Sequence, residues 1–215
     1  MPKMLVTGFD PFGGESVNPA FEAVKLLPDE IAGYEVVKLE VPTVFTKSAR
    51  VLEDAIDREE PDVVLCVGQA GGRSAMSVER VAINLVEARI PDNDGEQPMD
   101  EPVRADGETA YFATLPVKAM AKAMNDAGVP AFVSYTAGTY VCNWLMYNAL
   151  YLLARKRPEA RGGFVHVPFA TEQVVGKANG MPSMSVSVMA DALRAALEAC
   201  VANDEDIKVV SGETH

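Results

Sequence analysis

The chain has 215 residues, enough for one sizeable hydrophobic core, and its 48% hydrophobic and 23% charged residues are typical of a globular protein. Its net charge of −12 argues against nucleic acid and anionic membranes as partners, because both are bound through basic surfaces. We therefore expect one domain over residues 1–215, with a polar tail from about residue 204.

The first half of the chain alternates between strand-like and helix-like segments. Short apolar or alternating runs predict strands over residues 3–7, 34–41, 62–67 and 78–88. Asn18 followed by Pro19 is typical of a helix start, and it predicts a helix over residues 20–27. Apolar residues at helical spacing predict a second helix over residues 46–60.

The second half continues this alternation after an interruption. Residues 89–108 contain three prolines, several aspartates around Gly95 and few apolar side chains, so we expect a mobile functional loop there. The remaining patterns predict helices over 115–127, 141–153 and 184–201, and strands over 131–134 and 162–167. The alternation favours an α/β fold with a largely parallel sheet, followed by a loose polar tail after residue 203.

The three cysteines, Cys66, Cys142 and Cys200, are an odd number without a disulfide-framework spacing, which favours free thiols in a reducing cytoplasm. The amino-terminal apolar run, Met4 to Val6, is too short for the core of a secretion signal. The sequence contains no C-x-x-C, H-E-x-x-H or acidic metal-loop motif, so we expect no metal and no cofactor.

Cys142 is the first candidate for a catalytic residue. It follows a glycine-containing loop and stands near the start of an apolar segment that ends in Arg155-Lys-Arg-Pro158, a helix stop signal. Unpaired N–H groups and the helix dipole at such a start stabilise a thiolate and can hold an oxyanion. The alternative is that Cys142 is a small buried hydrophobic residue, as most free cysteines are.

A cysteine nucleophile usually needs an adjacent base. The chain has two histidines, and because His215 is the last residue, His166 is the internal candidate. His166 lies at the end of the strand predicted over 162–167, and Cys142 follows the strand predicted over 131–134. Because sites in open α/β sheets gather at the carboxyl ends of strands, we expect both residues at the same rim. A histidine packed in the core is the alternative.

Four segments, which lie in the same order as in the family, resemble the pyroglutamyl-peptidase I family of cysteine peptidases, also called pyrrolidone-carboxylate peptidases. Ser134 to Asn143 resembles the family's active-site cysteine signature, and Gly68 to Asn84 resembles its glutamate signature. Thr7 to Gly14, followed by Asn18-Pro19, and His166-Val-Pro168 are the other two.

The resemblance implies a three-layer α/β/α sandwich with a largely parallel, mixed central sheet. It also implies a catalytic triad of Cys142, His166 and Glu79 that hydrolyses the amide bond after an N-terminal pyroglutamyl residue through a thioester. The expected partners are N-terminally pyroglutamylated peptides and further copies of the chain, as a tetramer or dimer. From the sequence alone, Glu79 could equally form a surface ion pair with Arg80.

The substrate ring would be a flat, neutral lactam, which needs aromatic walls and a few fixed polar partners. The resemblance implies a pocket lined by Phe9, Phe12, Asn18, Gln69, Ile90, Tyr140 and Val141, with Arg89 helping to hold the oxyanion. For the two phenylalanines, packing in the core is the alternative.

Two other functions remain open at this level. The glycine-rich stretch Gly68–Gly72 with Arg73 could hold phosphate in a nucleoside phosphorylase-like enzyme, although it lacks the Lys-Ser/Thr ending of a P-loop. A non-catalytic binder of lactams or peptides would make Cys142 incidental. Phosphate-dependent turnover would select the first, and binding without turnover, unchanged by thiol alkylation, would select the second.

Overall fold

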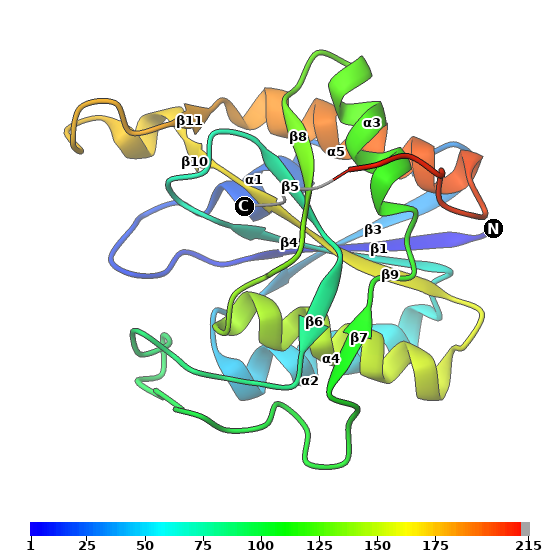
Figure 1. Ribbon diagram of the computed structural model, residues 1–215, viewed down its shortest axis with the longest axis horizontal. Coiled ribbons are helices and arrows are strands. Elements are labelled where there is room, and N and C mark those ends of the chain that lie inside the picture. Colours follow the sequence, from blue (N-terminus) through cyan, green and yellow to red (C-terminus); the bar gives the residue numbers. More distant parts are fainter. Residues whose placement is uncertain (212–215) are drawn as a thin grey trace.

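The structure is a computed structural model that describes residues 1–211. A seven-stranded sheet with the order β2-β3-β1-β4-β9-β5-β8 forms its centre (Figure 1). The strands are β1 (Lys3–Phe9), β2 (Glu30–Ile31), β3 (Tyr34–Val41), β4 (Val63–Gln69), β5 (Met76–Glu79), β8 (Ala131–Ser134) and β9 (Arg161–Val167). The pairs β1–β3, β1–β4, β4–β9 and β5–β8 are parallel, whereas β2–β3 and β5–β9 are antiparallel. The predicted largely parallel, mixed sheet is therefore confirmed.

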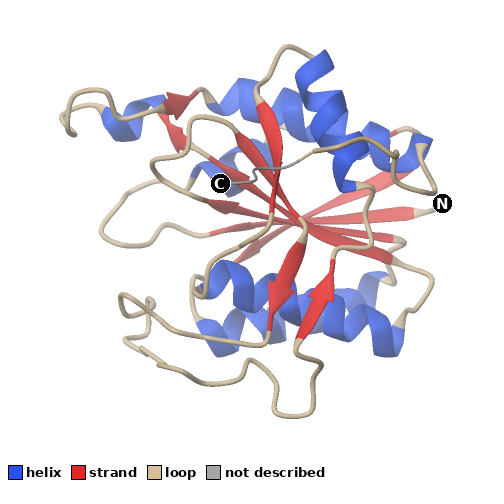
Figure 2. Ribbon diagram, viewed as in Figure 1, coloured by secondary structure: helices blue, strands red, loops and turns tan. Residues whose placement is uncertain are grey.

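Helices cover both faces of the sheet, so the predicted three-layer sandwich is confirmed (Figures 1 and 2). One layer holds α1 (Pro19–Lys25), α3 (Val117–Asp126) and α5 (Val186–Ala202), and the other holds α2 (Phe45–Glu59) and α4 (Val141–Lys156). The ribbon of β6 (Val81–Ile83) and β7 (Ala110–Phe112) packs on α4. Beyond the end of β9, β10 (Phe169–Ala170) pairs with β11 (Ser183–Met184) and leads into the short 3-10 helix η1 (Thr171–Val174).

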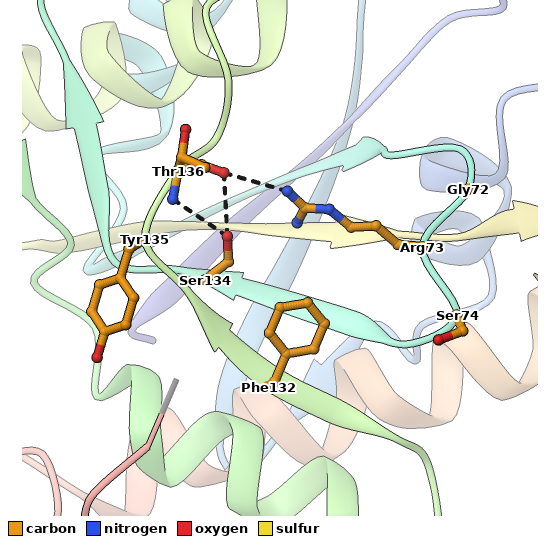
Figure 3. A pocket seen from close by; sticks show the side chains of 7 residues that line it. All are labelled: Gly72, Arg73, Ser74, Phe132, Ser134, Tyr135 and Thr136. Carbon is orange, nitrogen blue, oxygen red and sulfur yellow. Dashed lines mark hydrogen bonds between the residues drawn. The ribbon is translucent and has the colours of Figure 1, made fainter. Parts of the chain in front are cut away.

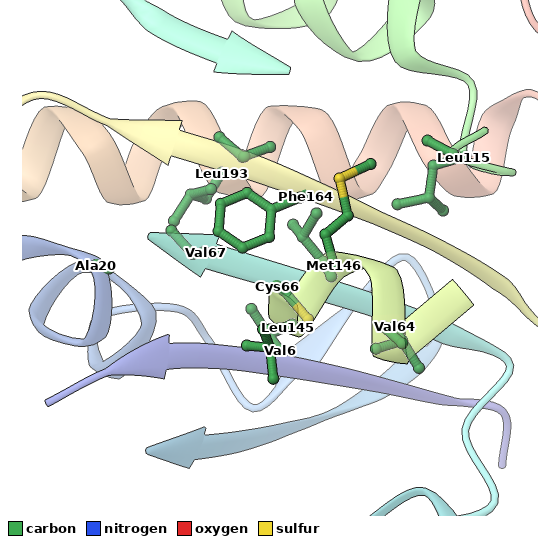
Figure 4. Packing of buried hydrophobic residues seen from close by; sticks show 14 of the residues in the cluster. Val6, Ala20, Val64, Cys66, Val67, Leu115, Leu145, Met146, Phe164 and Leu193 are labelled. Carbon is green, nitrogen blue, oxygen red and sulfur yellow. The ribbon is translucent and has the colours of Figure 1, made fainter. Parts of the chain in front are cut away.

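The core lies between the central strands and the two helical layers. Strands β1 and β4 are apolar nearly throughout because helices cover them on both faces. Figure 4 shows side chains from both helical layers and the sheet in one cluster, including Val6, Val67, Leu145, Phe164 and Leu193. No helix within residues 1–211 combines the length and the apolar character that crossing a membrane requires.

The single strand predicted over residues 78–88 is wrong. Strand β5 ends at Glu79 in the main sheet, and after Arg80 the chain enters β6, which belongs to the separate ribbon. The backbone of Arg80 donates to the carbonyl of Ser134 and accepts from the N–H of Ala113, so the chain changes sheets at this residue. A β-branched pattern does not show which strand is the partner, so the sequence could not reveal the break between β5 and β6.

Cys142 and His166 reach the same rim by a different route from the one expected. Strand β8 runs antiparallel to β9, so its carboxyl end does not point to the rim where His166 lies. Residues 135–140 instead carry the chain to the start of α4, in the helical layer that α2 and α4 form. Since α4 leads back into the beginning of β9, the amino end of α4 lies near the carboxyl end of β9. The two candidates do share a rim, through α4 rather than through β8.

Two helices are capped by residues far away in the chain. The residue before α2, Val44, offers no side-chain cap, and Asp92 from the loop over 89–108 accepts the N–H of Phe45 at 3.0 Å. In the same way Asp206 accepts the N–H of Ala119 at 3.0 Å at the start of α3. Asp206 therefore anchors part of the tail that the sequence predicted to be loose, and the last four residues lie outside the described part of the chain.

Candidate active site

The candidate site lies where three parallel strands end side by side. Strands β1, β4 and β9 finish at Phe9, Gln69 and Val167, and the first turn of α4 lies at the same rim. A cavity of about 650 Å³ opens there, and both Cys142 and His166 line it.

Cys142 is the second residue of α4, as the sequence predicted. Its sulfur lies against β4 at a place where residue 68 has no side chain. A Cβ atom built on Gly68 would lie 2.8 Å from Sγ of Cys142 and 2.7 Å from the ring of Phe164. A side chain at residue 68 would therefore displace the thiol or the ring, and the glycine leaves room for both.

The surroundings of Cys142 favour the neutral thiol over the thiolate. Burial raises its pKa to about 12, and the nearby carboxylate of Glu79 acts in the same direction, while Arg73 opposes it. In residues 1–211 no hydrogen bond joins the thiol to His166, although both line one cavity. A base that removes the proton during attack is therefore needed, and His166 is the only histidine within this range.

Glu79 and His166 form a buried hydrogen-bonded pair. Nδ1–H of His166 donates to Oε1 of Glu79 at 2.7 Å, and Glu79 is fully buried while His166 is 4% exposed. In the antiparallel β5–β9 pair Ser77 stands opposite His166, so Glu79 reaches it diagonally along the same face. This bond leaves Nε2 as the ring nitrogen that can accept a proton.

A second partner, Arg73, holds the Glu79 carboxylate in its charged form. Nη1 of Arg73 donates to Oε1 of Glu79 at 2.8 Å. Its Nη2 donates to the carbonyl of Thr136 at 3.4 Å (Figure 3). Burial alone would raise the pKa of Glu79, but the hydrogen bond from His166 and the charge of Arg73 bring it below its ordinary value.

The alternative of a surface ion pair between Glu79 and Arg80 is wrong. Glu79 is buried, and the guanidinium of Arg80 lies 5.4 Å from the ring centre of Phe112. Arg73 was considered only as a phosphate ligand. Because Glu79 engages its guanidinium, Arg73 is not a free anion site beside the glycine-rich loop, which weakens the phosphorylase alternative.

A small second cavity joins the large one at Cys142. It is lined by Phe9, Phe12, Asn18, Thr43, Gln69, Tyr140, Val141 and Cys142, which includes six of the seven expected pocket residues. Ile90 and Arg89 are exposed and line the large cavity instead, next to Glu87. Phe9 and Val141 are both core residues and wall residues, so the two interpretations of Phe9 are compatible.

Most polar side chains of the small cavity already use their donors. Nδ2 of Asn18 and Oγ1 of Thr43 donate to the carbonyl of Asp10, and the hydroxyl of Tyr140 donates to the carbonyl of Pro91. Oδ1 of Asn18 also accepts the N–H of Ala20 at the start of α1. Asn18 therefore shapes the loop after β1 through both ends of its amide.

The first turn of α4 offers unpaired backbone donors beside the thiol. The first helical hydrogen bond runs from the N–H of Trp144 to the carbonyl of Tyr140, and Tyr140 gives no side-chain cap. No residue in the described part of the chain accepts from the N–H groups of Val141, Cys142 and Asn143. Such groups are suited to stabilise a developing negative oxygen.

Several residues at the site escaped the sequence prediction. Thr43, Phe169 and Gln173 come from segments without a recognised signature, and only the structure brings them to the rim. The ring of Phe169 covers Gly71, where a Cβ atom would lie 2.1 Å from the ring. Gly71 and Gly72 before Arg73 were the one sequence signal in this region. They suggested that Arg73 binds phosphate, whereas in the structure Arg73 pairs with Glu79.

Comparison with known proteins places these features in a family. The profile of the family described as pyroglutamyl peptidase matches residues 2–203. The chain is 57% identical to the pyrrolidone-carboxylate peptidase of Enterococcus faecalis over 213 residues, covering 99% of this chain and 100% of the relative. It is 58% identical to that of Lactobacillus johnsonii, with the same coverage.

Solved structures agree with these sequence matches. The crystal structure of pyroglutamyl peptidase I from Bacillus amyloliquefaciens aligns with a TM-score of 0.94 at 47% identity, covering 98% of this chain and 100% of that one. The pyrrolidone carboxyl peptidase of Thermococcus litoralis aligns with a TM-score of 0.94 at 37% identity and the same coverage.

Proposed function

The chain belongs to the pyroglutamyl peptidase family, and we propose that it is a cysteine peptidase that removes an N-terminal pyroglutamyl residue from peptides. The buried hydrogen bond between Glu79 and His166, beside a cavity that Cys142 also lines, is the observation that carries the proposal. A carboxylate that orients an imidazole next to a thiol is the arrangement that activates a cysteine nucleophile.

In the first step His166 takes the proton of Cys142 at Nε2 while Sγ attacks the carbonyl carbon of the pyroglutamyl residue. Glu79 accepts the Nδ1–H throughout and stabilises the imidazolium that forms. His166 then gives its proton to the leaving amine as the C–N bond breaks, which leaves a thioester. Water, deprotonated by His166, hydrolyses the thioester and restores the thiol.

The tetrahedral intermediate carries a negative oxygen that needs fixed donors. The free N–H groups in the first turn of α4 lie beside the thiol and supply them. Arg89 lines the same cavity, and its guanidinium is a second, longer-range source of positive charge. In this proposal the backbone donors hold the oxyanion and Arg89 assists.

The two cavities divide the substrate between them. The small cavity, with the rings of Phe9, Phe12 and Tyr140, receives the flat pyroglutamyl ring. The large cavity is open and receives the residues that follow the cleaved bond, with Ile90 at its edge, 40% exposed. Cys142 lines both cavities, so the scissile carbonyl lies between them.

The setting of the reaction is part of the proposal. All three cysteines are free thiols, which suits a reducing cytoplasm. We also propose that residues 1–215 form one domain and that copies of it assemble into a homo-oligomer, a dimer or a tetramer. Size-exclusion chromatography with light scattering tests the assembly.

Release of a chromophore from a pyroglutamyl anilide tests the function directly. Turnover without added phosphate, abolished by a thiol-alkylating reagent, is the expected result. Turnover that depends on phosphate would support the phosphorylase alternative. Binding of the anilide without any release of chromophore would support a non-catalytic binder.

A further inference from the structure

Gln173 in η1 is a buried amide with a fixed orientation. It is 8% exposed, and its two ends meet groups of opposite kind. Its Oε1 accepts the N–H of Ala170 at 2.9 Å. Its Nε2 faces three acceptors: the carbonyl of Val17 at 3.2 Å, Oε2 of Glu15 at 3.5 Å and Oε1 of Gln69 at 3.0 Å.

The reverse orientation of this amide is excluded by its surroundings. If it were turned over, its oxygen would face a carbonyl and a carboxylate, and its nitrogen would face the N–H of Ala170. All of these contacts would be repulsive, and buried polar groups would be left unpaired. Lys177 pairs with Glu15 and holds that carboxylate in place. The loop after β1 therefore fixes the amide of Gln173.

A fixed Gln173 in turn fixes the amide of Gln69 at the end of β4. Because Nε2 of Gln173 is a donor, Gln69 must present its oxygen to it. The amide nitrogen of Gln69 is then the end left for the cavities, which Gln69 lines on both sides of Cys142. Within residues 1–211 it donates to no other residue, whereas the amide nitrogen of Asn18 and the hydroxyls of Thr43 and Tyr140 each already donate one hydrogen bond.

We propose that Gln173 is a positioning residue for substrate specificity: it holds Gln69 so that the amide N–H of Gln69 meets the ring carbonyl of the substrate. The inference rests on the proposed function. The ring carbonyl is what a pyroglutamyl residue has and a prolyl residue lacks, so the orientation of Gln69 decides whether the lactam is recognised. Gln173 itself does not touch the substrate.

Substitution of Gln173 by glutamate reverses the orientation that the amide of Gln69 must take. In its ionised form the new side chain only accepts, so Gln69 turns its nitrogen toward residue 173 and its oxygen toward the ring carbonyl. In Gln173→Glu we expect kcat/KM for a pyroglutamyl anilide to fall by about a hundredfold or more, since an unpaired polar contact is strongly rejected. The loss should lie mainly in KM, because the contact exists in the ground state as well. The slow cleavage of a prolyl anilide should not change.

A double-mutant cycle separates this role from general support of the fold. In a Gln69→Leu background, where the donor is absent, Gln173→Glu should change the pyroglutamyl-to-prolyl ratio no further. Gln173→Met, which removes the constraint without adding charge near Glu15, should give an intermediate loss. Glu172→Gln, on the exposed neighbour in η1, is the matched control and should leave the ratio unchanged.

Equal losses for both anilides in Gln173→Glu, or additive effects in the double variant, would overturn the proposal. Calorimetric titration of the same variants with free pyroglutamate and with proline measures the same preference without turnover. If the unsubstituted protein binds pyroglutamate but does not cleave the anilide, the proposed peptidase function fails. The role of Gln173 is then still decided by whether Gln173→Glu abolishes the binding preference.

Discussion

At the scale of single residues, the site depends on how a neutral thiol is brought to react. Burial and the charge of Glu79 both raise the pKa of Cys142, so a thiolate is costly before substrate arrives. The carboxylate of Glu79 lies behind His166 and stabilises the imidazolium when it forms, while Arg73 keeps that carboxylate ionised. The three side chains therefore favour transfer of the proton during attack over a thiolate formed in advance.

Replacement of the nucleophile gives the first prediction. Cys142→Ser should lower kcat/KM for a pyroglutamyl anilide by at least about a thousandfold, because a hydroxyl is a poor substitute for a thiol and nucleophile loss costs that much or more. Cys200→Ala, at a buried thiol of α5 away from the rim, should retain most of the activity. A Cys142→Ser variant with a near-normal rate would contradict the mechanism.

The pair of Glu79 and His166 gives the second prediction. Glu79→Gln can donate its amide N–H to Nδ1 and so impose the wrong tautomer, and we expect kcat to fall by about 10²–10⁴-fold, the range of comparable triad substitutions. His166→Ala should be at least as severe. Steady-state kinetics on purified, folded variants measures both, and an unchanged rate in Glu79→Gln would remove Glu79 from the mechanism.

The same substitution has a consequence for stability at different pH values. The folded-state pKa of Glu79 lies below its ordinary value of 4.5. Its ionised form therefore stabilises the fold fully above the unfolded-state pKa, and that contribution is lost as the pH falls through the folded-state pKa. The difference in unfolding free energy between the unsubstituted protein and Glu79→Gln should be larger at pH 7 than at pH 3. Urea denaturation at both pH values checks this sign.

At the scale of elements, strand β4 and helix α4 meet closely at one glycine. Gly68→Ala would place a methyl group against Sγ of Cys142 and the ring of Phe164. Overpacking of this kind costs about 1–3 kcal/mol, and a displacement of about 1 Å at a reacting atom can cost about a hundredfold in rate. We expect a kcat loss of that order, beyond the loss of stability.

Gly163→Ala in β9 is the matched control for this third prediction. Its methyl group would meet Cδ1 of Leu115 at 2.9 Å, the end of a flexible side chain. It should therefore lower the melting temperature with little effect on kcat. If both variants lost activity in proportion to their loss of stability, Gly68 would have no special relation to the thiol.

The loop over residues 89–108 gives the fourth prediction. It has no regular ladder beyond one isolated bridge, yet Asp92 accepts from the N–H groups of Phe45, Asp94 and Glu96. Asp92→Ala should remove these bonds and the remote cap of α2, which is typically worth about 1 kcal/mol. We expect faster proteolytic cleavage within 89–108, slowed in both proteins by a bound pyroglutamyl ligand. Cleavage unaffected by the ligand would separate the loop from binding.

The elements that the sequence predicted well are those with a local signal. Asn18-Pro19 marks the start of α1, and the apolar period of residues 46–60 marks α2, because both signals lie within the element itself. The caps supplied by Asp92 and Asp206 could not be found, since each lies more than 40 residues from the helix it caps. Contacts at such separations depend on the finished fold.

The candidate site shows the same division. Cys142, His166 and Glu79 stand in recognisable signatures, and the structure brings His166 and Glu79 into contact and places Cys142 on the same cavity. The direction of β8 was not readable, because a four-residue strand pairs equally well in either sense. Gln173 carries no signature, and its role follows from four partners contributed by three separate segments.

At the scale of the whole molecule, the sheet arrangement explains why the site lies where it does. Parallel strands β1, β4 and β9 end at one rim, and antiparallel β5 brings Glu79 into the sheet beside β9. The loops after β1 and β4 and the first turn of α4 then surround the strand ends. The cavity is therefore lined by segments that are far apart in the chain and joined through one core.

Binding at this rim should therefore stabilise the whole molecule, which is the fifth prediction. A ligand that binds only the folded state, at about 100 times its dissociation constant, adds about 2.7 kcal/mol of stability. For a chain of 150–250 residues this raises the melting temperature by about 5–10 °C. Pyroglutamate should produce such a shift in one cooperative transition, both in the unsubstituted protein and in Cys142→Ser, whose pocket is intact.

Proline at the same concentration should produce little, because its ring offers no carbonyl to Gln69 and its charged nitrogen would be desolvated among Phe9, Phe12 and Tyr140. Equal shifts with the two ligands would contradict the lactam pocket, and two separate transitions would contradict a single domain.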